Sequence, residues 1–144
     1  MTQTQDANRP RPGARCAVDA NVLVRAAIED DPVQAAAARR ILSDAELVSV
    51  ALPALCEFVW VLRRGLKRGD AEIELAIRAL IEARNVQVDR PAVEAGLAML
   101  RAGGDFADGV IAHEGRRLGG AQFVSFDHQA VTLLRAAGHD AITP

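Results

Sequence analysis

Segments with the apolar pattern of short strands alternate along this chain with segments of helical period, and this alternation restricts the fold more than any other feature. The strand-like segments are residues 15–19, 46–51, 85–89 and 122–127, with a fifth candidate at 139–143. The helix-like segments are residues 21–30, 31–45, 52–66, 70–84, 89–101, 105–119 and 128–138. Parallel strands need crossover connections, and these are usually helices. We therefore expect an α/β fold: a three-layer α/β/α sandwich around a mainly parallel sheet of four to five strands.

The chain has 144 residues, half of them hydrophobic, which is enough for one sizeable core. Residues 1–14 contain Pro10, Pro12 and Gly13 among polar residues and have no apolar period. We expect residues 1–14 to be a flexible leader and residues 15–144 to form a single domain.

Neither a membrane span nor a secretory signal is predicted. No apolar run approaches the roughly 18 residues that a membrane span needs, and the N-terminal segment is polar. Cys16 and Cys56 lie in apolar segments without the spacing of a zinc site, so we expect two reduced cysteines in the core. These features predict a cytoplasmic protein that does not associate with membranes.

Acidic residues recur where strand-like segments end and helices begin. Asp19 and Asp127 each end a predicted strand, and Asp105 and Asp108 lie three residues apart at the start of a helix. Ligand sites of open α/β sheets form at the carboxyl ends of the strands. Glu57 lies within a strongly apolar helix, where an unpaired carboxylate would be costly, so we expect it to have a specific partner.

A structural alternative exists for each of these aspartates, because aspartate is a preferred N-cap residue. Asp31, which precedes Pro32, and Asp70 are expected to cap helices in this way. Asp19, Asp105 and Asp127 have the same opportunity, and Asp108 is compatible with an ordinary acid of a first helical turn. The spacing of the acids alone leaves the capping and the functional interpretations equally open.

If these carboxylates converge, they need a cation. Two carboxylates 4 Å apart repel by about 4 kcal/mol at an effective dielectric constant near 20, so a group of four or five takes up protons or binds a metal ion. Mg²⁺ or Mn²⁺ is favoured, because both prefer oxygen ligands and the three histidines have no zinc-like spacing. Such a site supports hydrolysis of a phosphodiester.

Four motifs at these residues resemble those of the PIN-domain ribonucleases, and more closely those of the VapC-type toxins of bacterial toxin–antitoxin pairs. The motifs are, in chain order, AVDANVLVR, VSVALPALCEFVWVLRR, GGDFADGVIA and VSFDHQA. The resemblance extends from about Cys16 to Ile142.

The resemblance implies that Asp19, Glu57, Asp108 and Asp127 coordinate Mg²⁺ or Mn²⁺ or orient its waters. It implies an auxiliary acid at Asp105 and supporting polar roles for Asn21 and Ser125. Members of this family cut RNA, such as tRNA or rRNA, commonly as homodimers. They are held inactive by a cognate antitoxin that occupies a hydrophobic groove and inserts a basic side chain at the acids.

Binding to RNA is expected to be mainly electrostatic. The net charge of −2 gives no overall attraction to nucleic acid, yet 16 of the 17 basic residues are arginines, which are good phosphate ligands. The candidates for phosphate contacts are Arg39, Arg40, Arg63, Arg64, Lys67, Arg68, Arg116 and Arg117. The aromatic residues lie in apolar segments and are expected in the core, which disfavours recognition by base stacking.

Three alternatives remain. A dehalogenase-like phosphatase needs a second aspartate two residues after the first, where this chain has Asn21. A receiver domain needs a lysine near the end of a late strand, whereas the only lysine is Lys67 in a helix tail. A PIN fold without catalysis, which acts as a binding or scaffold module, is the third alternative.

Overall fold

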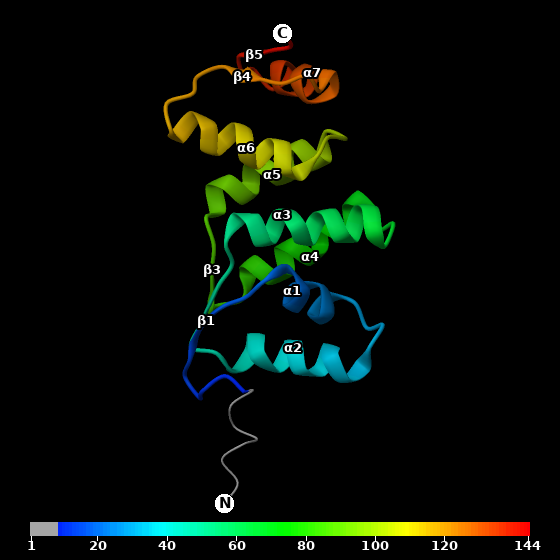
Figure 1. The fold of residues 1–144 in the computed structure, drawn as a ribbon, viewed down its shortest axis with the longest axis vertical. Helices are drawn as coiled ribbons and strands as arrows, with labels where there is room; N and C mark the ends of the chain where they lie inside the picture. Colours follow the sequence, from blue (N-terminus) through cyan, green and yellow to red (C-terminus); the bar gives the residue numbers. More distant parts are fainter. Residues whose placement is uncertain (1–8) are drawn as a thin grey trace, which may run out of the picture.

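The computed structural model describes residues 9–144, and its helices and strands alternate as the sequence predicts (Figure 1). Part of the expected leader, residues 1–8, lies outside the described residues, and residues 9–14 form no helix or strand. The strands are β1 (Arg15–Ala17), β2 (Leu47–Ser49), β3 (Val86–Gln87), β4 (Phe123–Val124) and β5 (Ala141–Ile142). The helices are α1 (Ala20–Ala27), α2 (Pro32–Asp44), α3 (Leu52–Trp60), the π-helical η2 (Val61–Gly65), α4 (Asp70–Glu82), α5 (Arg90–Arg101), α6 (Phe106–Arg117) and α7 (His128–Ala136).

Helix starts follow the predicted caps with one exception. The Asp31 carboxylate accepts from the backbone N–H groups of Val33 and Gln34, with Pro32 as the first residue of α2. The prediction that Asp70 caps α4 is wrong: Gly69 precedes the helix and Asp70 lies inside its first turn. There the Asp70 Oδ1 lies 3.6 Å from Arg63 Nε, so Asp70 contributes charge to the helix start without capping it.

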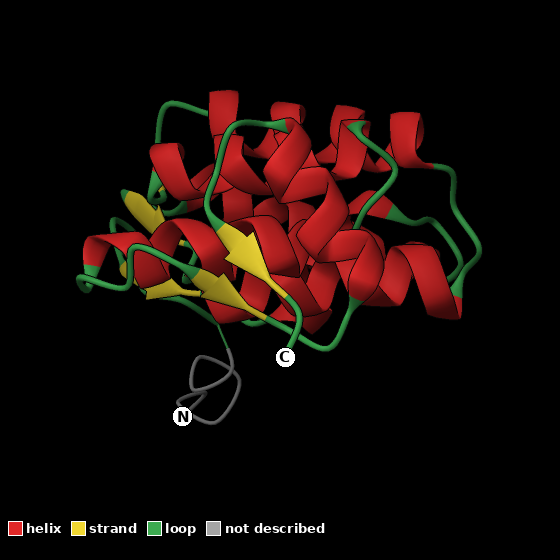
Figure 2. Ribbon diagram, turned by 90° about the horizontal axis from the view of Figure 1, so that it is seen from above, coloured by secondary structure: helices red, strands yellow, loops and turns green. Residues whose placement is uncertain are grey.

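All strand pairs are parallel, as predicted. Strand β2 pairs with β1 on one side, with Cys16 opposite Val48, and with β3 on the other, with Val48 opposite Val86. Strand β4 pairs with β5 in a separate two-stranded ladder. The five expected strands are therefore present, but they divide into two ladders. The strands lie together on one side of the packed helices (Figure 2).

Two clusters of buried side chains hold the helices on the strands. The larger cluster includes Val48 of β2, Phe58 of α3, Ile77 of α4 and Phe106 of α6. Full burial of one such side chain contributes about 1.5–3 kcal/mol. The smaller cluster joins the C-terminal ladder to α5, α6 and α7 through Met99, Ala112, Val131, Leu134 and Ala141. None of the helices in residues 9–144 is long and apolar enough to cross a membrane.

Two glycines allow α5 and α6 to cross at very short range. A Cβ on Gly109 of α6 would lie 2.4 Å from the backbone oxygen of Ala95. A Cβ on Gly96 of α5 would lie 2.5 Å from the ring of Phe106. Close contact at this crossing locates the first turn of α6, which carries Asp108.

Candidate active site

The candidate acids lie on four helices that follow one another in space. Figure 1 shows α1, α3, α6 and α7 in this order from bottom to top. Helix α1 packs on α3, and α3 packs on α6. Helix α6 contacts α7 through the cluster that joins Ala112 to Val131 and Leu134. The acids on or next to these helices, in the same order, are Asp19, Glu57, Asp105 with Asp108, and Asp127.

Three of the candidate aspartates are N-caps of helices, as the capping interpretation predicts. Oδ1 of Asp19 accepts from the backbone N–H of Val22 at 3.2 Å. Asp105 and Asp127 cap α6 and α7 in the same way, at 3.0 and 3.1 Å. Each cap uses one carboxylate oxygen, so the other oxygen is available to a further ligand.

Asp108 differs from these caps. It is half-buried, whereas Asp19, Glu57, Asp105 and Asp127 are exposed. Burial raises the pKa of the Asp108 carboxyl, and the charges of Asp105 and Asp127 raise it further. The aspartates next to α6 and α7 are therefore close enough to repel one another.

The pKa of Cys56, in α3, is raised by burial and also by one of these negative charges. Burial, followed by the charge of Asp105, raises the pKa of the Cys56 thiol to about 11. Asp105 is therefore within electrostatic range of the helix that carries Glu57. Cys56 and Cys16 are free thiols, and both are half-buried against the larger cluster, not within the core as expected.

No cationic side chain in residues 9–144 compensates these acids. Within that range, none of the five candidate acids forms an ion pair. Elsewhere arginines pair with acids readily, as Arg101 does with Glu74 at 2.7 Å. Asp108 is thus repelled by Asp105 and Asp127, and none of the five acids is paired with an arginine or lysine in the described part of the chain.

The reason given by the sequence for singling out Glu57 is wrong. Its sequence neighbours Leu55, Phe58 and Val59 are buried, but Glu57 itself is exposed. A helix turns about 100° per residue, so neighbours in sequence face different directions. Glu57 therefore carries no cost of burial, and its role as a metal ligand stays a prediction that rests on its position.

The five candidate carboxylates are of the type that binds a hard divalent cation, but their oxygens are more widely spaced than those of a closed coordination shell. Uncompensated carboxylates are the ligands that Mg²⁺ and Mn²⁺ prefer. In the described part of the chain, no three of the five acids have ligand atoms that all lie within 4.8 Å of one another. Mg²⁺ usually keeps several waters and is held by one or two carboxylates, so wider spacing is compatible with binding through water.

A second group of potential ligands was not found from the sequence. Asp89, His113 and Glu114 have ligand atoms within 4.8 Å of one another, the only such set among residues 9–144. Arg117 already bridges the two acids, at 3.2 Å from Asp89 and 2.8 Å from Glu114. Sequence spacing does not predict this group, because Asp89 meets α6 only in the folded chain.

The two supporting polar residues have different environments. Ser125 Oγ accepts from the backbone N–H of Asp127 at 3.0 Å, so it orients the backbone of the fourth acid. Asn21 is exposed, and its side chain forms no hydrogen bond within the described residues. The supporting roles of both residues stay predictions.

Two aromatic residues expected in the core are on the surface. The side chains of Trp60 and Phe126 are 61% and 79% exposed. Trp60 lies three residues after Glu57 on the same helix, and Phe126 immediately precedes Asp127. Aromatic faces next to the acids are therefore available for stacking, contrary to the expectation from the sequence.

Half of the basic residues proposed as phosphate ligands are engaged in structure. Arg39, Arg63, Arg68 and Arg117 form ion pairs with acids. Arg40, Arg64, Lys67 and Arg116 form none within residues 9–144, and of these Arg64 and Lys67 follow α3 directly on the surface.

Comparison with known proteins agrees with this arrangement at the level of the family. No curated protein is similar enough to this chain to count as a match. The family model described as PIN domain matches residues 16–137, which include every candidate acid and strands β2, β3 and β4. This match, the parallel α/β architecture and the acid-bearing helices show that the chain belongs to the PIN domain family, whose members are generally nucleases.

Proposed function

We propose that this protein is an endoribonuclease that depends on Mg²⁺ or Mn²⁺. The observation that carries this proposal is the set of acids on successive helices that form no ion pair within residues 9–144, among which Asp105 and Asp127 repel Asp108. When bound, the ion supplies Lewis acidity toward the phosphodiester and its attacking water.

The candidate acids would have different roles in binding the ion. Asp19, Glu57, Asp108 and Asp127 would hold it directly or through water. Asp108 gains most from a cation, because its charge is opposed by burial and by two neighbouring carboxylates. Asp105 adds negative charge while its Oδ1 caps α6.

RNA contacts would come from side chains beside the acids. Trp60 and Phe126 offer exposed rings, and stacking of a base on such a ring contributes about 1–3 kcal/mol. Arg64 and Lys67 offer charges for phosphates on the segment that follows α3. This arrangement favours unpaired bases near the cleaved bond.

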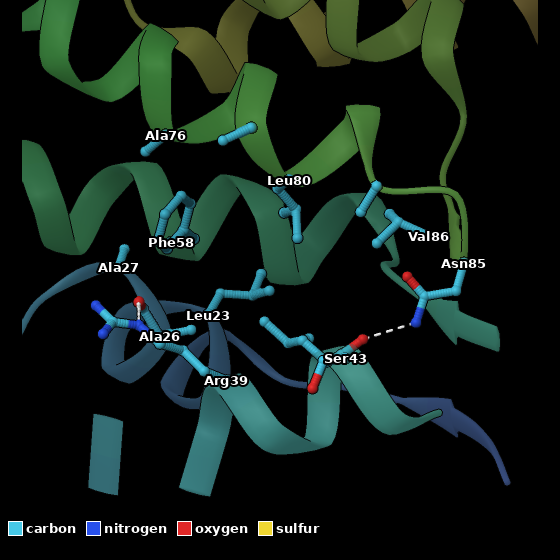
Figure 3. Close-up of a pocket in the computed structure, with 13 residues that line it drawn as sticks. Leu23, Ala26, Ala27, Arg39, Ser43, Phe58, Ala76, Leu80, Asn85 and Val86 are labelled. Carbon is cyan, nitrogen blue, oxygen red and sulfur yellow. Dashed lines mark hydrogen bonds between the residues drawn. The ribbon is translucent and has the colours of Figure 1, made fainter. Parts of the chain in front are cut away.

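We further propose that the protein is the toxin of a toxin–antitoxin pair, acting in the cytoplasm as a homodimer to inhibit translation or growth. An apolar groove of about 510 Å³ supports a partner-binding role. Figure 3 shows Leu23, Phe58 and Leu80, from three different helices, facing this groove. None of the candidate acids lines it, so a partner could occupy the groove while a connecting segment reaches the acids.

An RNA digest tests the nuclease. Purified protein should cleave RNA in Mg²⁺ or Mn²⁺, and EDTA, Asp19→Asn or Asp108→Asn should each abolish cleavage. Cleavage that survives all three treatments would exclude the proposed mechanism. Absence of cleavage by the wild type, with RNA still bound, would favour the non-catalytic alternative.

Growth tests the toxin role separately. Expression of the wild type should arrest growth, and a small protein encoded beside the gene should relieve the arrest. Equal growth of cells that express the wild type and Asp19→Asn would contradict the toxin role without affecting the nuclease proposal.

A further inference from the structure

The turn between α5 and α6 accepts hydrogen bonds from two distant side chains. Arg63 Nη1 donates to the backbone oxygen of Gly104 at 2.7 Å. Gln129 Nε2 donates to the backbone oxygen of Gly103 at 3.1 Å. Two consecutive carbonyls of one turn are therefore held from two sides.

Both donors belong to elements that carry candidate acids. Arg63 lies in η2, which continues directly from α3 and its Glu57. Gln129 lies in the first turn of α7, two residues after Asp127. The turn itself leads into Asp105 and Asp108. Three of the four acid-bearing elements are thus tied together at Gly103 and Gly104.

The turn has little freedom to shift by itself. Gly103 has a φ of +91°, a conformation that side-chain-bearing residues rarely adopt. Gly104 is buried, and a Cβ there would lie 2.6 Å from Met99 Sδ and 2.7 Å from Leu133 Cδ1. Its backbone N–H donates to the oxygen of Met99 at 2.9 Å. Because this turn is tight and requires glycine, a shift of Arg63 or Gln129 would be expected to move the whole turn, together with Asp105 and Asp108.

The hydrogen bond to Gly104 comes from a residue of the π-helical turn η2. A π-helical turn departs from the α-helical period, and such turns are rare and frequently occur at functional sites. The Arg63 side chain is 30% exposed, and its Nε lies 3.6 Å from Asp70 Oδ1. Asp70 therefore pairs with the same guanidinium that donates to Gly104, and Arg63 forms no ion pair with any candidate acid within residues 9–144.

We propose that Arg63 and Gln129 are positioning residues that set the spacing between Glu57, Asp108 and Asp127 through the Gly103–Gly104 turn. This inference rests on the proposed metal-dependent nuclease. Residues that orient metal ligands from outside the ligand set typically change metal affinity or activity by about 10- to 100-fold when they are removed. Arg63 should have the larger effect, because a charged donor forms the stronger hydrogen bond.

Arg63→Ala and Gln129→Ala test the inference, with Arg84→Ala and Thr132→Ala as matched controls. Arg84 follows α4 and Thr132 lies on α7; both are exposed, neither belongs to the proposed metal or RNA site, and within residues 9–144 their side chains form no hydrogen bond or ion pair. Three measurements are made on each folded variant: Mn²⁺ affinity by calorimetry, kcat and KM for RNA cleavage, and hydrogen exchange of the Ala107 and Asp108 amides.

Arg63→Ala should lower Mn²⁺ affinity and kcat by about 10- to 100-fold, leave KM for RNA nearly unchanged, and accelerate exchange at Ala107 and Asp108. Gln129→Ala should do the same to a smaller extent, and the controls should match the wild type. Wild-type values for both Ala variants would overturn the inference, and so would equal losses in the controls.

Failure of the proposed function would be seen separately, as a wild type that neither binds Mn²⁺ nor cleaves RNA. In that case amide hydrogen exchange is the only test of the positioning role. Unchanged exchange in Arg63→Ala would overturn this role, and faster exchange confined to residues 103–108 would support it.

Discussion

Helix α6 carries one acid from each of two groups, Asp108 and Glu114, and the two groups differ in whether an arginine pairs with their acids. At its start, Asp108 lies within electrostatic range of Asp105 and Asp127 and has no cationic partner in the described residues. Glu114, fewer than two turns further along the helix, shares the guanidinium of Arg117 with Asp89, the N-cap of α5. We call the first set, with Asp19 and Glu57, the open cluster, and the second set, with His113, the paired cluster.

Both clusters raise a pKa, but the effect on charge is opposite: the carboxylate of Asp108 is disfavoured, whereas the charged form of Arg117 is favoured. Burial and like charges raise the pKa of Asp108 in the open cluster. In the paired cluster, the hydrogen bond from Arg117 to Glu114 and the charges of Glu114 and Asp89 raise the pKa of Arg117, which holds it in the charged form. Proximity of acids alone therefore does not mark a metal site. Ligand atoms of the paired cluster lie within 4.8 Å of one another and those of the open cluster do not, yet both acids of the paired cluster already pair with Arg117.

The largest expected effect is a difference in RNA cleavage between two variants, each of which lacks one acid of one cluster. Asp108→Asn should lower RNA cleavage by more than about 100-fold, because it deletes a proposed ligand. Asp89→Asn should leave kcat unchanged, since asparagine also caps a helix well and α5 keeps its start. Steady-state kinetics of both variants measure the effect. Equal losses would mean that the two clusters do not divide the roles as described.

The α5–α6 crossing supports both clusters, and its disruption should be the next largest effect. Gly109→Ala places a methyl group 2.4 Å from the Ala95 backbone oxygen, so we expect a loss of about 1–3 kcal/mol in the free energy of unfolding. Gly115→Ala in the same helix meets nothing within 4 Å and should stabilise by up to about 1 kcal/mol through helix propensity. Urea denaturation compares the two variants, and the same sign for both would contradict the close crossing.

The charge of Asp108 should make stability depend on pH. Its pKa is raised in the folded state, so the folded protein holds the proton more tightly than the unfolded chain. This contribution is complete below the pKa of the unfolded carboxyl and is lost as pH rises through the folded pKa. The free energy of unfolding of the wild type should therefore fall relative to Asp108→Asn over this interval. Parallel pH profiles for the two proteins would show that the open cluster does not repel.

Loss of compensation in the paired cluster should have the smallest effect. Arg117 is exposed, so Arg117→Ala should lower the melting temperature only slightly and leave RNA cleavage intact. It should, however, add one weak Mn²⁺ site, because Asp89, His113 and Glu114 then resemble the open cluster. Calorimetric titration of Asp108→Asn with and without Arg117→Ala isolates this site. An unchanged stoichiometry would show that arginine is not what keeps the ion out.

The elements of this fold and the identity of the candidate acids follow from local sequence patterns. The α/β class, the parallel pairing and the capping role of Asp31 depend on the apolar period and on local hydrogen bonds, which few neighbouring residues determine. The four motifs likewise placed the chain in the PIN domain family, which the family model confirms over residues 16–137.

Only the tertiary structure decided what surrounds each side chain. Glu57 and Trp60 have apolar neighbours in sequence but lie on the surface, because helical rotation turns them away from Phe58 and the core. The bond from Arg63 to Gly104 spans 41 residues, and Asp89 meets Arg117 from another helix. Compensation of charge depends on groups that are distant in sequence, so the distinction between the open and the paired cluster exists only in the folded chain.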